Sequence, residues 1–159
     1  MRLYSNGVYY HLTVHQQNKQ YPNLILLHGF MGSQKVFRPL IKNLSAFCNP
    51  ITIDLLGHGK TETKPEPERF KTENQAADLN SILSRLSLDN LYLCGYSMGG
   101  RLAIQTCISH PGYFEGVIIE SAHCGISSAE EKLQRQRIDE ERATAIEADF
   151  ENFLTDWRD

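Results

Sequence analysis

Short apolar runs alternate along the first 120 residues with longer segments in which apolar residues recur every third or fourth position. The runs predict strands at residues 24–27, 51–53, 91–94 and 117–119. The run 24–27 is continuously apolar, which is typical of a strand buried on both faces, and we expect 117–119 to be another buried strand. Residues 8–14 are rich in β-branched and aromatic side chains and predict a strand that can lie at a sheet edge.

The segments between these strands carry helical periodicity. Residues 33–47 place apolar side chains at spacings of three and four, with Ser33 as the expected N-cap. Residues 72–75 have the form of a capping box ahead of a second apolar stripe, and residues 101–109 predict a third helix. Strands that alternate with helices in this way predict an α/β fold with a mostly parallel sheet.

The pattern changes near the C-terminal end of the sequence. From Ser128 the chain is strongly charged, it opens with a second capping box at 128–131, and its apolar positions are sparse. We therefore predict two domains, a core at residues 1–127 and a helical segment at residues 128–159. The segment is either a solvated helix or a lid over an active site.

Composition excludes several function classes. A chain of 159 residues with a net charge of −3 offers no electrostatic case for a nucleic acid or a membrane surface as partner. It has no apolar run near eighteen residues and no signal peptide, which predicts a cytoplasmic protein. The four cysteines are widely spaced and favour buried thiols over a zinc site or disulfides. We expect no metal and no cofactor, and the oligomeric state stays open.

The motif Gly95-Tyr96-Ser97-Met98-Gly99 lies between the strand at 91–94 and the helix at 101–109. This order of strand, Gly-x-Ser-x-Gly turn and helix is the sequence form of a nucleophile elbow, which raises a serine hydroxyl above the end of a sheet. The flanking residues must be small because the turn is strained. Ser97 is therefore the candidate catalytic residue, and a tightly packed glycine-rich turn without catalytic function is the alternative.

Two further loops follow strands of the predicted sheet. His28-Gly29-Phe30-Met31-Gly32 follows residues 24–27, and residues 54–59, Asp-Leu-Leu-Gly-His-Gly, follow 51–53. Together with the elbow, these loops resemble the α/β-hydrolase superfamily. Within it the chain is most similar to the 2-succinyl-6-hydroxy-2,4-cyclohexadiene-1-carboxylate synthases, which are pyruvate-eliminating lyases of menaquinone biosynthesis. Arg101 directly after two glycines, and the arginine-bearing segment 129–137, are the features that point to these synthases.

The resemblance implies a reaction and a set of catalytic groups. Ser97, activated by a histidine, would act as the base that removes a proton while pyruvate is expelled. The backbone N–H groups of Phe30 and Met98 would form an oxyanion hole, in which fixed donors stabilise developing negative charge. A member of the superfamily with a neutral pocket would instead be an esterase or a C–C hydrolase, and Arg101 is the residue that separates the two.

The resemblance also implies a small polycarboxylate as substrate. Arg101 and Arg135 would bind its carboxylates, since a guanidinium can engage two oxygens at once. Tyr96 and Trp157 would line the pocket. Each has a structural alternative: Arg101 as a helix-surface cation, Arg135 as one charge among many in a solvated lid, and Trp157 as a core anchor.

The histidines have separate roles. We expect His28, His58 and His110 to be structural, whereas His123 lies near the expected site and could touch substrate. In this superfamily the triad follows the order serine, acid, histidine. No histidine follows His123 in this sequence.

The resembled enzymes run to roughly 250 residues, a common size for one-domain α/β enzymes. We therefore expect this chain to correspond to their N-terminal part, without the last strands that carry the acid and the histidine. An unassisted serine hydroxyl is a poor base, so we expect the isolated chain to be inactive or nearly so. A non-enzymatic remnant is the remaining alternative, and the expected sheet would expose an apolar edge.

Overall fold

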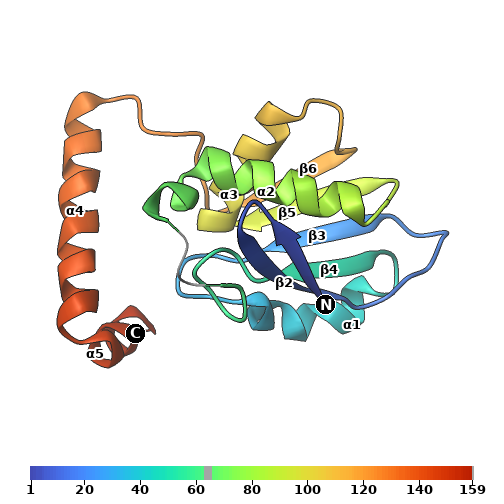
Figure 1. The fold of residues 1–159 in the computed structure, drawn as a ribbon, viewed down its shortest axis with the longest axis horizontal. Coiled ribbons are helices and arrows are strands. Elements are labelled where there is room, and N and C mark those ends of the chain that lie inside the picture. The colour runs from blue at the N-terminus through green and yellow to red at the C-terminus, as the bar shows by residue number, and fades with distance from the viewer. Residues whose placement is uncertain (63–65, 159) are drawn as a thin grey trace. The chain divides into compact units, whose positions relative to one another are not determined.

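The computed structural model describes residues 1–62 and 66–158. These residues separate into two compact units, Met1–Ala122 and a second unit that begins at His123, five residues before the predicted boundary at 128. In the first unit, the described residues form a six-stranded sheet with the order β1-β2-β4-β3-β5-β6 (Figure 1). The strands are β1 Arg2–Ser5, β2 Val8–Val14, β3 Asn23–Leu27, β4 Asn49–Ile53, β5 Leu91–Tyr96 and β6 Gly116–Glu120.

Strands β4, β3, β5 and β6 run parallel to one another, whereas β1 and β2 are antiparallel additions beside β4. Helices cover both faces of this sheet. On one face α2 (Thr72–Arg85) and α3 (Met98–Ser109) pack over Ile25 and Leu27, and on the other η1 (Gln34–Phe37) and α1 (Arg38–Leu44) pack over Leu24 and Leu26. The continuous apolar run at 24–27 is thus buried from both sides, and the predicted α/β fold with a mostly parallel sheet is confirmed.

Strand β1 was absent from the predicted elements. It forms a hairpin with β2 through Asn6 and Gly7, both of which have positive φ (45° and 92°). An Asn-Gly pair between two strands is a strong local signal for a two-residue hairpin turn, and it was the signal available in the sequence.

The buried carboxylate of Asp78, on α2, anchors this hairpin. It accepts hydrogen bonds from Ser5 Oγ (3.1 Å), Asn6 Nδ2 (2.7 Å) and Tyr10 OH (2.8 Å), and it forms an ion pair with Arg69. A buried charge needs such partners to offset its lost hydration. Asp78 therefore couples the antiparallel edge of the sheet to the helix layer.

Two predicted helix starts differ from the structure. Residues 33–47 do not form one helix: Ser33 caps the short 3-10 helix η1, and α1 begins afresh with Pro39 in its first turn. A proline is tolerated there because its missing N–H would have no intrahelical acceptor. At α2, the predicted capping box is not formed, because Thr72 is already helical and makes no side-chain cap.

The strand predicted at 117–119 is present as β6, but the prediction that it is buried was wrong. Val117 and Ile118 in β6 are 45% and 53% exposed. Among the described strands, β6 is the last in the sheet and pairs only with β5. An apolar strand is buried on both sides only when a further strand and its helix cover it, and the described residues include no such neighbour.

The second unit holds two helices, α4 (Ala129–Ala148) and α5 (Phe150–Arg158). The side chain of Ser128 accepts a hydrogen bond from the N–H of Glu131 (3.3 Å), as the second capping motif predicted. None of the side chains of α4 is buried. The expectation of buried thiols holds fully for Cys48, whereas Cys94 and Cys107 are half-buried and Cys124, at the start of this unit, is exposed.

Candidate functional site

Ser97 lies at the turn between β5 and α3 with φ 51° and ψ −111°, a conformation that L-residues rarely adopt. Its N–H donates to the carbonyl of Glu120 at the end of β6 (2.8 Å), and its carbonyl accepts from the N–H of Arg101 (3.1 Å). These bonds hold the strained residue on both sides. The residue is half-buried, so it is not enclosed in the packed interior.

The glycines around Ser97 are required by close backbone packing. A Cβ on Gly95 would lie 2.3 Å from the carbonyl oxygen of Gly99, and one on Gly99 would lie 2.4 Å from that of Leu27. Both distances are far below van der Waals contact, and both neighbours are backbone atoms. The sharp turn therefore brings the start of α3 directly onto the end of β3.

The loop after β3 packs against the elbow. A Cβ on Gly29 would lie 2.9 Å from the ring of Tyr96 and 3.4 Å from the Cβ of Ser97. The turn that contains Phe30 is closed by a hydrogen bond from the N–H of Gly32 to the carbonyl of Gly29 (3.1 Å). The tertiary structure thus brings the predicted oxyanion loop next to the predicted nucleophile.

Met98, the second predicted oxyanion donor, is the first residue of α3. The first N–H groups of a helix have no intrahelical acceptor, so they are free to bind an anion. The elbow therefore presents a helix N-terminus beside the Ser97 hydroxyl.

His28 holds the loop after β3 in place, as expected. Its ring is fully buried, Nε2 accepts the N–H of Leu55 (3.0 Å), and Nδ1 donates to the carbonyl of Gly29 (2.8 Å). An acceptor at Nε2 and a donor at Nδ1 define one neutral tautomer. Burial lowers the pKa of His28 and outweighs the opposing effect of its bond to Gly29.

His58 lies beside this loop and is also structural. Its ring centroid is 5.2 Å from that of His28 and 6.1 Å from that of Phe30, and Nδ1 is 2.9 Å from the carbonyl of Leu56. The loops after β3 and β4 therefore share a cluster of three rings.

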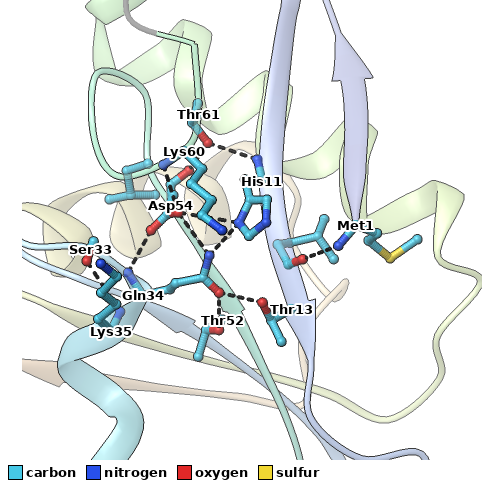
Figure 2. A network of polar contacts seen from close by, with 12 residues as sticks. Met1, His11, Thr13, Ser33, Gln34, Lys35, Thr52, Asp54, Lys60 and Thr61 are labelled. Carbon is cyan, nitrogen blue, oxygen red and sulfur yellow. Dashed lines mark hydrogen bonds and ion pairs between the residues drawn. The ribbon is translucent and has the colours of Figure 1, made fainter.

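A buried polar network lies beneath the loop after β4 (Figure 2). Asp54, 1% exposed, accepts hydrogen bonds from the N–H of Gln34 (2.7 Å), from Gln34 Nε2 (2.9 Å) and from the N–H of Lys60 (3.0 Å). Burial would raise the pKa of this carboxyl, but the three hydrogen bonds outweigh it and lower the pKa. A Cβ on Gly59 would lie 2.2 Å from the Asp54 carboxyl carbon, so the loop can close around the carboxylate only with glycine there.

The side-chain amide of Gln34 links this carboxylate to β2 and β4. Its oxygen accepts from the hydroxyls of Thr13 (2.6 Å) and Thr52 (3.0 Å), while its nitrogen donates to Asp54 and to Nδ1 of His11 (2.5 Å) (Figure 2). Sequence reasoning missed this network. The available signal was an aspartate directly after a buried strand, followed by two glycines at positions 57 and 59.

Arg101 and Tyr96, predicted to bind substrate, flank Ser97 in the structure. Arg101 is exposed in the first turn of α3 and forms no ion pair within residues 1–62 and 66–158. Tyr96 is 49% exposed, with its ring against Gly29. Both residues are therefore exposed to solvent, and both are neighbours of Ser97 in the sequence.

Arg135 and Trp157 belong to the second unit. Nε of Arg135 donates to the carboxylate of Asp139, one helical turn further on (2.8 Å). Trp157 stacks on Phe153 with ring centroids 5.7 Å apart, and the guanidinium of Arg142 lies 5.0 Å from the Trp157 ring centre. Arg135 therefore makes the surface ion pair that its structural alternative predicts, whereas Trp157, 40% exposed, is not anchored in a core.

In the described part of the chain, no group of three or more His, Cys, Asp or Glu side chains could hold a metal ion. No helix among these residues has both the length and the apolar character needed to cross a bilayer.

Known proteins resemble the chain in both sequence and fold. It is 35% identical over 135 residues to a Bacillus subtilis (strain 168) protein assigned provisionally as 2-succinyl-6-hydroxy-2,4-cyclohexadiene-1-carboxylate synthase, and the match covers 84% of this chain and 49% of that protein. It is 31% identical over 137 residues to the synthase of that name from Escherichia coli O1:K1 / APEC, covering 81% and 53%.

A solved structure of MenH from S. aureus matches with a TM-score of 0.81 at 30% identity, covering 93% of this chain and 55% of that chain. The chain therefore spans about half the length of these relatives. A family model described as the alpha/beta hydrolase fold matches residues 22–159. Since that match includes the elbow, both neighbouring loops and the parallel sheet, this chain belongs to the α/β-hydrolase fold family.

Proposed function

We propose that this chain supplies the nucleophile elbow and oxyanion loop of a 2-succinyl-6-hydroxy-2,4-cyclohexadiene-1-carboxylate synthase. The reaction would eliminate pyruvate from 2-succinyl-5-enolpyruvyl-6-hydroxy-3-cyclohexene-1-carboxylate. The observation that carries the proposal is the strained, half-buried Ser97 with the loop of Gly29 packed on it. Sequence relatives that carry the synthase name support this choice within the family.

The identity of residue 97 favours a chemical function over a structural one. Glycine would adopt φ 51° and ψ −111° without steric penalty, so tight packing alone would be met best by glycine. A serine there retains backbone strain of about 1–3 kcal/mol. Strain of this size at a residue with a reactive hydroxyl supports a catalytic Ser97.

In the proposed reaction Ser97, once deprotonated by a histidine, removes a proton from a carbon of the substrate ring. The electron pair of that C–H bond forms a ring double bond, and the C–O bond to the enolpyruvyl group breaks. The departing enolate takes up a proton and becomes pyruvate, so no oxidant or cofactor is consumed. The N–H groups of Phe30 and Met98 would stabilise the negative charge, each contributing about 3 kcal/mol in comparable sites.

Substrate binding in this proposal depends on arginine. Arg101 would engage a carboxylate from the first turn of α3, with Tyr96 beside it, because its guanidinium is exposed. Arg135 would engage another, since its ion pair with Asp139 occupies Nε and leaves the terminal N–H donors. Trp157 would add an aromatic contact to the substrate.

The test is pyruvate release, because it separates the lyase from a hydrolase. The chain should be assayed alone and together with the C-terminal half of the Escherichia coli O1:K1 relative. We expect little or no turnover alone, and turnover in the mixture that Ser97→Ala lowers by at least about 10³-fold. Cleavage of simple esters without pyruvate release would instead favour the esterase alternative.

A further inference from the structure

The turn of the N-terminal hairpin carries the only Asn-Gly pair of the sequence. Asn6 and Gly7 connect β1 to β2 (dark blue in Figure 1), and both residues are exposed. Every other asparagine of the chain precedes a residue that has a side chain. Asn6 is therefore the asparagine whose following backbone nitrogen is least shielded.

An asparagine in this setting can lose its side-chain amide, since asparagine is one of the thermolabile residues. The backbone nitrogen of Gly7 attacks the side-chain carbonyl carbon of Asn6, so that a C–N bond forms and closes a succinimide ring. The bond from that carbon to Nδ2 breaks, and Nδ2 leaves as ammonia with the proton of the Gly7 N–H. Water then opens the ring at either carbonyl and gives an aspartate or an isoaspartate. The reaction consumes water and releases ammonia.

The structure leaves the Gly7 nitrogen open to this reaction. A Cβ added to Gly7 would meet no atom within 4 Å, so the residue faces open space. Its N–H has no hydrogen-bond acceptor within residues 1–62 and 66–158. Glycine also has the widest conformational freedom of any residue, and ring closure requires the backbone to move.

The Asn6 side chain, by contrast, is held in place. Its Nδ2 donates to Oδ1 of Asp78 (2.7 Å), whose carboxylate is fully buried on α2. Ring closure requires the Asn6 side chain to rotate onto the Gly7 nitrogen, and this hydrogen bond opposes the rotation. The reaction is therefore confined to molecules in which the hairpin has opened locally.

Asp78 cannot accommodate the product. The NH2 group of Asn6 and the guanidinium of Arg69 can only donate, so Asp78 meets both as a carboxylate. After deamidation the side chain of residue 6 has no N–H, and a second negative charge faces the buried one. The two charges repel each other, and Asp78 loses one of its donors. An isoaspartate also adds a carbon to the main chain of a two-residue turn, whose length sets the strand register.

We propose that Asn6 is a deamidation site that the folded hairpin holds in check, and that its conversion releases the hairpin β1–β2 from α2. Apart from the contacts of Asp78, α2 reaches the hairpin through an exposed hydrogen bond from Arg85 to the carbonyl of Tyr4 (2.6 Å). Since β2 also carries side chains of the main core, its release loosens the packing at this edge of the sheet. Refolding does not reverse the change, so released molecules accumulate with time.

Peptide mapping by mass spectrometry follows the reaction in the parent chain. The protein is kept in mildly alkaline buffer with and without guanidinium chloride, and aspartate and isoaspartate at position 6 are measured in the tryptic peptide 3–19. We expect Asn6 to convert before any other asparagine in guanidinium chloride. In the folded chain it should convert at least about tenfold more slowly, because only the opened hairpin reacts. Earlier conversion of another asparagine in the denaturant, no conversion in the folded chain, or equal rates would overturn the proposal.

Amide hydrogen exchange measures the release of the hairpin. The converted chain is separated from the parent by ion exchange, because it carries one more negative charge. We expect the amides of residues 8–14 to exchange at least about tenfold faster in the converted chain than in the parent. Unchanged exchange at these residues would show that the hairpin stays attached and would overturn the proposal.

Matched variants separate the added charge from the lost hydrogen bond. Asn6→Asp should reproduce the fast exchange of the converted chain. Asn6→Gly removes the same hydrogen bond without adding a charge, and Gly-Gly also suits a two-residue hairpin turn, so its effect should be smaller. Asn74→Asp makes the same change at an exposed site on α2, where Nδ2 donates to the carbonyl of Glu68 (2.9 Å), and should leave residues 8–14 unchanged.

Equal effects of Asn6→Asp and Asn6→Gly, or an equal effect of Asn74→Asp, would overturn the role of the charge beside Asp78. Circular dichroism checks that the variants fold like the parent. If Asn6→Asp does not fold, the converted parent chain still provides the comparison with Asn6→Gly. None of these measurements depends on pyruvate release, so the outcome is independent of the proposed function.

Discussion

The backbone N–H of Leu55 donates to Nε2 of His28 across 3.0 Å and so joins the loop after β4 to the loop after β3. His28 in turn holds the carbonyl of Gly29, which packs against Ser97. On the other side Leu55 follows Asp54, whose carboxylate is fixed by Gln34 and Lys60. Hydrogen bonds, joined through the Asp54–Leu55 peptide bond, thus link the buried Asp54 network to the loop that would hold the oxyanion.

His28 makes stability depend on pH. Its pKa in the folded chain lies below the ordinary value of 6.5, so the unfolded chain binds a proton first as the pH falls. The stabilisation is therefore complete above about pH 6.5 and is lost as the pH falls from there toward the folded pKa. His11 and His15 have pKa shifts in the same direction.

Urea unfolding at pH 8 and pH 5.5 measures this effect. We expect the parent to be less stable at pH 5.5, and His28→Gln to be less stable than the parent at pH 8 but less sensitive to pH. Equal pH sensitivity in the two proteins would show that His28 is not the group responsible.

Asp54→Asn should destabilise the fold by about 3 kcal/mol. The substitution removes the negative charge that accepts three hydrogen bonds. The NH2 group of the asparagine would then face the N–H donors of Gln34 and Lys60. Asp139→Asn is the matched control, because that carboxylate is half exposed in a helix-surface ion pair, and its loss should cost less than about 0.5 kcal/mol. Urea denaturation compares them, and similar losses would contradict the role given to the buried network.

Replacing Ser97 by glycine should stabilise the chain relative to Ser97→Ala by about 1 kcal/mol. Both substitutions remove the hydroxyl, but only glycine relieves the strain at φ 51°. Thermal unfolding of the two variants provides the comparison. If the Ser97→Ala variant proved as stable as Ser97→Gly, the backbone at residue 97 would not be strained. Strain would then no longer support a catalytic role for Ser97.

Gly99→Ala should destabilise the chain by about 3 kcal/mol, because its Cβ would meet the carbonyl oxygen of Leu27 at 2.4 Å and neither backbone can move freely. Gly116→Ala is the control. Its Cβ would meet only the ring of Tyr92, at 3.0 Å, which can rotate away, so we expect a loss below about 1 kcal/mol. The free energy of unfolding of both variants is measured by chemical denaturation. A larger loss in Gly116→Ala than in Gly99→Ala would contradict the packing described for the elbow.

Arg101→Ala should raise KM for the polycarboxylate in the reconstituted mixture by about 10-fold or more, because a charged hydrogen bond contributes about 1.5–3 kcal/mol. Arg101→Lys should recover only part of the loss, since lysine cannot form the two-point contact. Initial rates of pyruvate release measure both. An unchanged KM in Arg101→Ala would show that this arginine is a surface charge that does not bind the substrate.

Local sequence pattern predicted the parallel strands well. The apolar run of β3, the short strand of β4 and the strand before the elbow were each located because burial on a helix-covered sheet requires such runs. The break between η1 and α1 and the failed capping box at Thr72 escaped prediction. Helix ends depend on which backbone groups neighbouring elements satisfy, and a pattern of apolar positions does not record that.

The sequence by itself determined the fold class, the elbow at Ser97 and the small residues around it, because these depend on local backbone sterics and on the burial of apolar runs. Only the tertiary structure decided three other features: the exposed edge at β6, the packing of Gly29 on Ser97, and the network that joins Asp54 to His11 through Gln34. Each of these depends on contacts between segments that are distant in the chain. Spacing within one segment cannot specify them, because they arise only when the sheet order and its edges are fixed.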